Sequence, residues 1–257
     1  MENIVQDFLN GICCNPAVVY NFDVTSSNPT MWQDNLGISD AESFANWLWE
    51  KMGFEAGGPK PIVTDFNLVN GRLFANVTGA KNLILKGNLD NTYITNVDAL
   101  PDDLVVIDFT KNYIQTLPIL PSHLLELSIS YNKLISIPLL PDSLIKLDIS
   151  CQGHDGSIYS SLSSIENIVS FPPNIQFLNL RDNNLLNTYL PLPESVNHFD
   201  ILNCNYTTAQ MDDFARDFLI GTPPNKLWFY SGSQLTYEVV SPEFQDLLYQ
   251  NTNNVYF

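Results

Sequence analysis

The sequence predicts an α/β solenoid. We expect a curved parallel sheet with a mostly irregular, polyproline-like convex side, an N-terminal helical cap and a C-terminal helix–strand–helix cap. Three observations support this prediction. A short apolar–x–apolar pattern recurs along the chain at similar intervals, and a polar residue follows most copies at a fixed position. Helix-start motifs stand on both sides of the repeats.

Six registered copies carry the repeat. They read LILKGN, IDFTKN, LSISYN, LDISCQ, LNLRDN and FDILNC, and they begin at Leu83, Ile107, Leu127, Leu147, Leu178 and Phe199. LWFYSG at Leu227 is a looser copy, and FNLVNG at Phe66 is a candidate for a degenerate first copy. The intervals between successive starts are 24, 20, 20, 31, 21 and 28 residues. Six copies in register predict stacked repeats that bury one another's apolar residues.

Each position of the repeat has a physical reason. Alternation with period two predicts a short strand whose apolar residues face inward. The Asn that ends most copies has a short amide that can pair with backbone groups left open at a turn. Cys204 and Gln152 replace that Asn in two copies, and prolines such as Pro121 and Pro141 precede the strands. We expect the prolines to favour an extended return path and to exclude helix from the convex side.

The chain divides into three regions. Residues 1–60 are predicted to form an N-terminal helical cap, 61–205 the repeats with an insertion at 151–170, and 206–257 a C-terminal repeat with helices and a cap. The insertion interrupts the fifth repeat. It is interpreted either as a surface loop or as part of a binding face.

The N-terminal cap is predicted from two apolar helices. The first covers Asn3 to Asn10, and the second starts at a capping box formed by Ser39 and Glu42 and ends at Gly53. Tryptophans at 32, 47 and 49 are interpreted as packing residues of this cap, with a ligand-binding aromatic cluster as the alternative.

The C-terminal cap carries similar signals. Thr207 and Gln210 form a capping box that opens a helix whose inward residues are Met211, Phe214, Ala215 and Phe218. The strand NKLWFY follows, and Pro242 then stands in the first turn of a last helix.

These repeats resemble the short bacterial type of leucine-rich repeat, with its L-P-x-x-L-x-x-L-x-x-x-x-N-x-L pattern. Leu117 to Pro138 is the best match, and the resemblance covers roughly residues 80–205. Secreted effectors of Gram-negative pathogens share this repeat, and some carry a ubiquitin-ligase domain after it. No Cys-x-Asp nucleophile motif stands in the last fifty or so residues here. The terminal segment is similar to the caps of leucine-rich-repeat proteins of bacteria and their phages, which implies an interaction protein or a virion component.

Composition restricts the partners. Lys and Arg total 11 against 28 Asp and Glu, for a net charge of −17. Nucleic acid and anionic membranes reward basic patches, so neither is an expected partner. No stretch reaches the length of a membrane span, and the N-terminus has no basic segment typical of a signal peptide. We therefore expect a cytoplasmic site of synthesis, with a virion as one destination, and reduced cysteines.

A search for catalytic motifs favours a non-enzyme without a cofactor or metal. Glycine-rich phosphate loops, H-E-x-x-H and nucleophile elbows are absent from the sequence. Cys151, His154 and Asp155 form a local nucleophile–base–acid cluster, but real triads assemble from distant positions. The same cluster lacks the second Cys or His pair of a zinc site.

The predicted concave face of the sheet is therefore the candidate partner-binding surface. It presents aspartates in one row and two exposed aromatic residues, which suit a protein partner. The candidate residues are Asp108, Glu126, Ser128, Tyr131, Lys146, Asp148, Phe177, Asn179, Arg181, His198 and Asp200. The resulting hypothesis is a binding scaffold incorporated into a larger assembly such as a phage virion. The alternatives are a bacterial effector or surface protein that binds a host protein, a carbohydrate-binding module, and an enzyme built on Cys151.

Overall fold

A computed structural model gives the fold. The structure describes residues 21–51, 59–87, 93–153, 170–183, 189–204, 206–220, 227–229, 241–251 and 254–256. The predicted helix at 3–10 and most of the predicted insertion, residues 154–169, lie outside the described residues.

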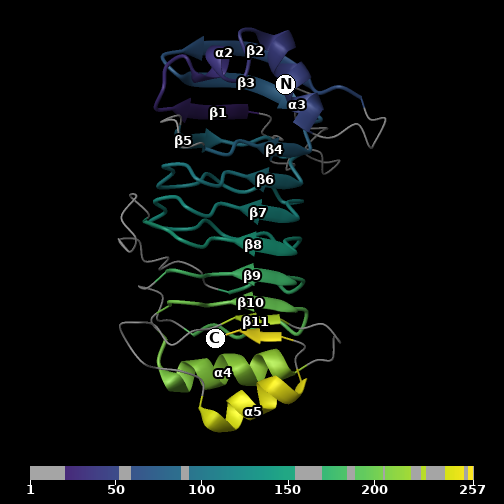
Figure 1. Cartoon of the computed structure of the whole chain (residues 1–257). Helices are drawn as coiled ribbons and strands as arrows, with labels where there is room; N and C mark the ends of the chain where they lie inside the picture. Colours follow the sequence, from purple (N-terminus) through teal and green to yellow (C-terminus); the bar gives the residue numbers. More distant parts are fainter. Residues whose placement is uncertain are drawn as a thin grey trace, which may run out of the picture.

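A parallel sheet of eight strands runs along most of the molecule (Figure 1). Its order follows the sequence: β4 (Asn82–Ile84), β6 (Val106–Asp108), β7 (Glu126–Ser128), β8 (Lys146–Asp148), β9 (Phe177–Asn179), β10 (His198–Asp200), β11 (Leu227–Phe229) and β12 (Asn254–Tyr256). Every neighbouring pair is parallel and keeps the same register. The six registered repeats and the looser copy at Leu227 are therefore confirmed as strands.

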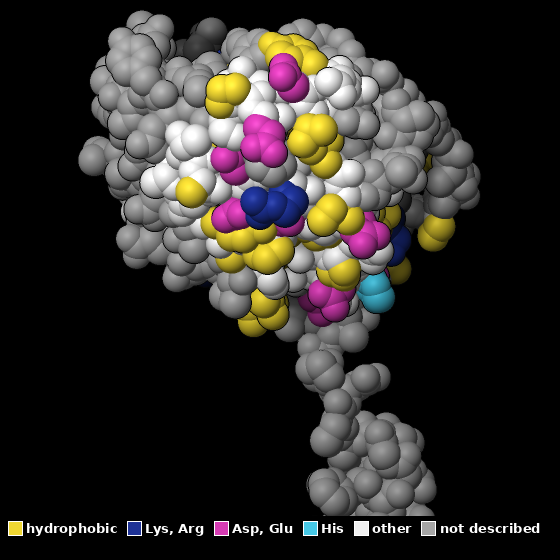
Figure 2. All heavy atoms as spheres, turned by 90° about the horizontal axis from the view of Figure 1, so that it is seen from below, with side chains coloured by type: hydrophobic (Ala, Val, Ile, Leu, Met, Phe, Trp, Pro, Cys, Tyr) yellow, Lys and Arg dark blue, Asp and Glu magenta, His cyan; other side chains and the backbone are white. Residues whose placement is uncertain are grey.

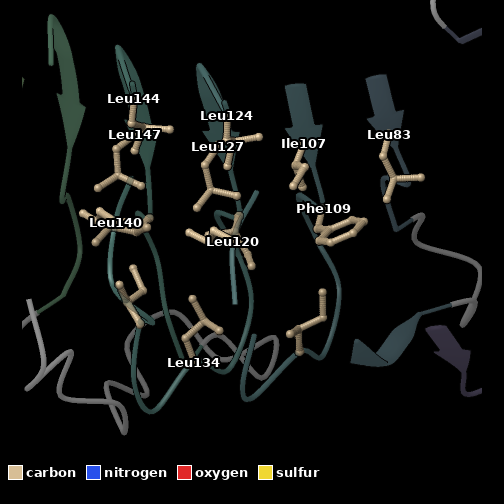
Figure 3. Packing of buried hydrophobic residues seen from close by; sticks show 14 of the residues in the cluster. Leu83, Ile107, Phe109, Leu120, Leu124, Leu127, Leu134, Leu140, Leu144 and Leu147 are labelled. Atoms are coloured by element: carbon tan, nitrogen blue, oxygen red, sulfur yellow. The ribbon is translucent and has the colours of Figure 1, made fainter. Parts of the chain in front are cut away.

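The core is a column of apolar side chains beneath this sheet (Figure 3). The central residue of each strand points inward, as Leu127 and Leu147 do, and both are fully buried. Leu124 and Leu144 form a second row just before the strands, and Leu134 closes the core from the opposite side. Burial of each leucine contributes roughly 1.5–3 kcal/mol, so regular stacking supplies most of the stabilisation.

Four terminal amides, those of Asn112, Asn132, Gln152 and Asn183, join the backbones of neighbouring repeats. Asn132 donates its amide hydrogens to the carbonyls of Phe109 and Ile129 at 2.9 and 3.0 Å. Its Oδ1 accepts the backbone N–H of Ile114 at 3.0 Å. Gln152 pairs in the same way with the equivalent groups one repeat later. Gln152 therefore preserves these hydrogen bonds between repeats, because the longer glutamine side chain reaches the equivalent backbone groups.

The residue before the terminal Asn, Gln or Cys of five repeats has a left-handed backbone. The φ angles are 62° at Lys111, 57° at Tyr131, 56° at Cys151, 57° at Asp182 and 56° at Asn203. Such residues cost energy outside glycine, so their recurrence marks a turn that the whole repeat imposes.

The prolines also take part in the turns that precede the strands. Pro121 accepts the N–H of Leu124 through its carbonyl, and Pro141 does the same for Leu144. These bonds close tight turns that begin at the prolines and lead directly into the strands. The described return segments, residues 109–125 and 129–145, contain no helix. Strand β7 lies between them.

The N-terminal region differs from the predicted helical cap. It contains a four-stranded antiparallel sheet in the order β2 (Ile62–Val69), β3 (Arg72–Thr78), β1 (Asn21–Ser26) and β5 (Ile94–Ala99). FNLVNG is not a degenerate repeat, because Asn70 and Gly71 form the turn of the β2–β3 hairpin with φ of 50° and 80°. The pair Asn-Gly is the strongest short-range signal for such a turn.

Two helices pack on this sheet, α2 (Met31–Asp34) and α3 (Ala41–Lys51). The capping box predicted at Ser39 and Glu42 is wrong by one residue. Asp40 accepts the N–H of Ser43 at 2.8 Å, and the Ser43 hydroxyl accepts the N–H of Asp40 at 3.0 Å. Trp32 is buried and donates to the carbonyl of Gly71 at 2.7 Å, as expected of a packing residue.

The C-terminal cap contains α4 (Thr208–Leu219) and α5 (Pro242–Asn251). The capping box of Thr207 and Gln210 is present, and all four predicted inward residues of α4 are buried. Strand β12 follows α5 and extends the parallel sheet beyond the helix–strand–helix that the sequence predicted. No helix in the described part of the chain is long and apolar enough to cross a membrane.

Candidate binding surface

The outward face of the parallel sheet, called the sheet face below, carries three rows of side chains. The shared strand register fixes the first two rows. Row 1 is Asn82, Val106, Glu126, Lys146, Phe177 and His198, and row 2 is Ile84, Asp108, Ser128, Asp148, Asn179 and Asp200. Backbone bonds such as that from Lys111 N to Ser130 O continue the register to row 3, which holds Lys86, Thr110, Ser130, Ser150, Arg181 and Leu202.

From Glu126 to His198, row 1 is a continuous series of side-chain contacts. The ammonium of Lys146 lies 3.4 Å from a carboxylate oxygen of Glu126 and 5.6 Å from the centre of the Phe177 ring. The Phe177 ring stacks on His198, with 4.1 Å between the ring centres and 13° between their planes. Four consecutive strands thus hold their row 1 side chains in defined positions, which lowers the entropy that binding must overcome.

Row 2 is held by its own backbone. Asp108, Asp148, Asn179 and Asp200 each accept the N–H of the residue two positions later at 3.1 Å. Since Asn179 makes the same bond as its neighbours, the turn needs an acceptor oxygen and not a negative charge. The charges of the three aspartates are therefore not required by the local fold.

Those three charges are unequally compensated. Lys86 lies 3.0 Å from Asp108, and Arg181 lies 3.9 Å from Asp200. Asp148 accepts only from Ser150, and within the described chain it forms no ion pair with Lys or Arg. The centre of row 2 is thus a half-buried carboxylate without a cation.

Burial shifts the pKa values of two residues near Asp148. Desolvation raises the pKa of Asp200, which is 6% exposed, and outweighs the opposing effects of the Leu202 N–H and of Arg181. The nearby Asp182 and Asp148 charges raise it further. Desolvation also lowers the pKa of His198, against the opposing effect of Asp148. His198 is therefore neutral at neutral pH, which suits its stacking on an apolar ring.

Tyr131 and Cys151 lie beyond row 3, at the left-handed positions of their repeats. Tyr131 is 38% exposed, and the ammonium of Lys111 lies 5.9 Å from its ring centre. Burial raises the pKa of the Cys151 thiol to about 12, so it is protonated and a weak nucleophile. The other members of the predicted cluster, His154 and Asp155, lie outside the described residues. No group of three or more potential metal ligands occurs among the residues that the structure does describe.

The structure brings ten of the eleven candidate residues into rows 1 to 3, with Tyr131 just beyond. Sequence reasoning missed the stacking of Phe177 on His198 and the pairing of Lys86 with Asp108. Both could be found by aligning the repeats, because the partners occupy equivalent or adjacent positions in consecutive copies. At the C-terminal end of the solenoid, near α4 and α5, acidic and hydrophobic side chains lie interspersed over the surface (Figure 2).

Comparison with known proteins gives no family assignment. No protein-family model matches the chain, and no curated protein matches it. Among solved structures the chain is similar to YopM from Yersinia enterocolitica WA-314, with 18% sequence identity and a TM-score of 0.36. The match covers 70% of this chain and 36% of that one. The chain thus spans about a third of the length of that protein, and its description as a leucine-rich-repeat-type solenoid rests on its own repeat geometry.

Proposed function

We propose that the chain is a non-enzymatic scaffold that binds another protein through the sheet face. The observation that carries this proposal is the connected series from Glu126 through Lys146 and Phe177 to His198. Charged and aromatic side chains that are already ordered lose little entropy on binding, and aromatic residues in such settings are frequent hot spots.

Asp148 defines the chemistry of the partner. Its carboxylate stands without a cation between two aspartates that are partly compensated. Adjacent strands lie ~4.8 Å apart, so each of those aspartates is about 10 Å from Asp148. A Lys or Arg side chain of the partner that enters at this point would meet Asp148 beside the Phe177 ring. The proposed partner surface therefore presents a basic residue flanked by apolar ones.

Incorporation into a larger assembly, with a phage virion as the concrete case, is a narrower form of the same proposal. Strand β12 ends the order of the parallel sheet, and a terminal strand can be extended by a strand of another subunit. Binding of a host protein by an effector or surface protein would use the same face. Carbohydrate binding is less well supported, because Lys146 and His198 approach the Phe177 ring from the two flanking strands.

A pair of charge-matched variants tests the proposal. Asp148→Asn removes one charge but keeps the acceptor for Ser150, as Asn179 shows one repeat later. Asp142→Asn removes one charge from an exposed turn of the same repeat. Tagged wild-type and variant proteins are used to capture partners from the native source, with quantification by mass spectrometry.

We expect a specific partner to be retained by Asp142→Asn. Its binding should be weakened roughly tenfold to 150-fold by Asp148→Asn, the range for a charged hydrogen bond. Equal retention by both variants would place the contact away from the sheet face. Recovery of the partner in purified native particles would support the narrower form, and its absence there would count against it.

A further inference from the structure

A pocket of about 290 Å³ lies between the N-terminal cap and the first turn of the parallel sheet. Its lining residues belong to α2, α3, β4, β5 and the segments next to them, and Figure 1 shows where these elements lie. The lining residues are Met31, Asn35, Leu36, Trp47, Lys51, Ile84, Leu85, Lys86, Ile94 and Asn112. The volume is at the lower end of the range for small-molecule sites.

The walls of this pocket are fixed. Met31, Trp47, Leu85 and Ile94 are each less than 8% exposed, so the rest of each side chain packs into the core. Asn112 has its oxygen and nitrogen engaged by backbone groups, among them Ile94 N at 2.7 Å and Leu85 O at 2.7 Å. The site is therefore formed before any ligand arrives, which favours affinity.

The charge of the pocket is opposite to that of the chain. Acidic residues outnumber basic ones by 28 to 11 in the sequence, yet the described lining contains two lysines and no Asp or Glu. Lys51 lies 5.7 Å from the centre of the Trp47 ring and, among the residues that the structure describes, has no carboxylate within 4 Å. The ammonium of Lys86 already pairs with a carboxylate oxygen of Asp108 at 3.0 Å.

We propose that this pocket binds a carboxylate ligand with an apolar body. The apolar part would lie against Trp47, Leu85 and Ile94, and the carboxylate would pair with Lys51 and Lys86. The same chemistry is presented by a small organic acid and by the C-terminal residue of a polypeptide. This site shares Ile84 and Lys86 with the edge of the sheet face, but it does not depend on the proposed protein-binding function.

Octanoate, N-acetyl-leucine and 1-octanol are the probes, with calorimetry or ligand-observed NMR as the readout on the full chain. We expect octanoate or N-acetyl-leucine to bind and octanol to bind more weakly. Preference for octanoate assigns a small acid as the source, and preference for N-acetyl-leucine assigns a polypeptide end. Failure of both acids to bind at millimolar concentration would overturn the proposal.

Variants identify the cations. Lys51→Gln and Lys86→Gln should each weaken binding roughly twofold to fivefold, the range for partly exposed ion pairs. Lys60→Gln, at an exposed lysine outside the pocket, should leave binding unchanged. Asp108→Asn should strengthen binding about twofold, because it frees Lys86 from its carboxylate partner. Equal effects of the three lysine variants, or weaker binding by Asp108→Asn, would contradict the assignment.

Discussion

Single residues decide how one repeat is joined to the next. Asn132 is fully buried and satisfies three carbonyls and one N–H from two adjacent repeats. The sequence indicated this role, because the same position recurs at the end of most copies. It did not indicate that Gln152 would serve equally, since the reach of a side chain depends on backbone positions that only the fold provides.

Replacement of Asn132 by Ala should therefore destabilise the chain strongly. Several buried backbone groups would lose their partner, so we expect the free energy of unfolding to fall by about 2–5 kcal/mol. Urea unfolding followed by circular dichroism measures this loss. Asn174→Ala is the control, because Asn174 is exposed and its bond to Asp142 is 3.5 Å long, and it should change stability by less than about 0.5 kcal/mol. Similar losses of stability for the two variants would contradict the stabilising role of the hydrogen bonds that Asn132 makes between repeats.

Asp200 is a residue whose charge opposes folding. Its pKa is raised in the folded state because burial disfavours the carboxylate, so the folded chain binds the proton more tightly than the unfolded chain. The stabilisation from protonation is complete below the unfolded-state pKa and is lost as the pH rises through the folded-state pKa. A charge kept at this cost is what a binding role for row 2 would explain.

Asp200→Asn should therefore raise the melting temperature at pH 7, and the gain should shrink as the pH is lowered toward the usual range of aspartate. Asparagine keeps the acceptor for Leu202, as Asn179 does for Arg181. Melting temperatures of wild type and variant across pH 4 to 7 provide the measurement. A loss of stability at pH 7 would show that the pairing with Arg181 outweighs desolvation.

At the scale of elements, local signals predicted helices better than they predicted the antiparallel sheet. The helix α4 was predictable from Thr207 and Gln210, because a capping box involves neighbours only. Strands β1 and β5 pair across a long stretch of sequence, and no local pattern announces that contact. The β2–β3 hairpin was misread because its alternation has the same period as the repeat strands, although Asn70-Gly71 marked the turn.

The start of α3 offers a direct check at this scale. Asp40→Ala should lower the melting temperature by about 2–4 °C, the usual effect of losing an N-cap in a chain of this size. Ser39→Ala should have almost no effect, because the Ser39 side chain is outside the cap that the structure shows. The opposite ranking of the two variants would restore the capping box first predicted from the sequence.

At the scale of the whole molecule, the sheet face was largely predictable and the cap was not. A repeat with fixed register carries each alignment position onto the same row, so ten candidate residues fall on rows 1 to 3. The pocket beneath α3 depends on how the N-terminal cap meets the first repeat. That junction occurs once in the chain and leaves no periodic signal in the sequence.

The central claim is that partners bind the sheet side of the solenoid. It is tested most directly by photo-crosslinking from two positions that are only eight residues apart. Tyr131 stands beside row 3 of the sheet face, and Leu139 is 84% exposed on the return path of the same repeat. A photoreactive phenylalanine analogue is introduced at each position in turn, and adducts formed in the native source are compared. We predict a specific adduct from position 131 and none from position 139. The same adduct from position 139 alone would contradict the account.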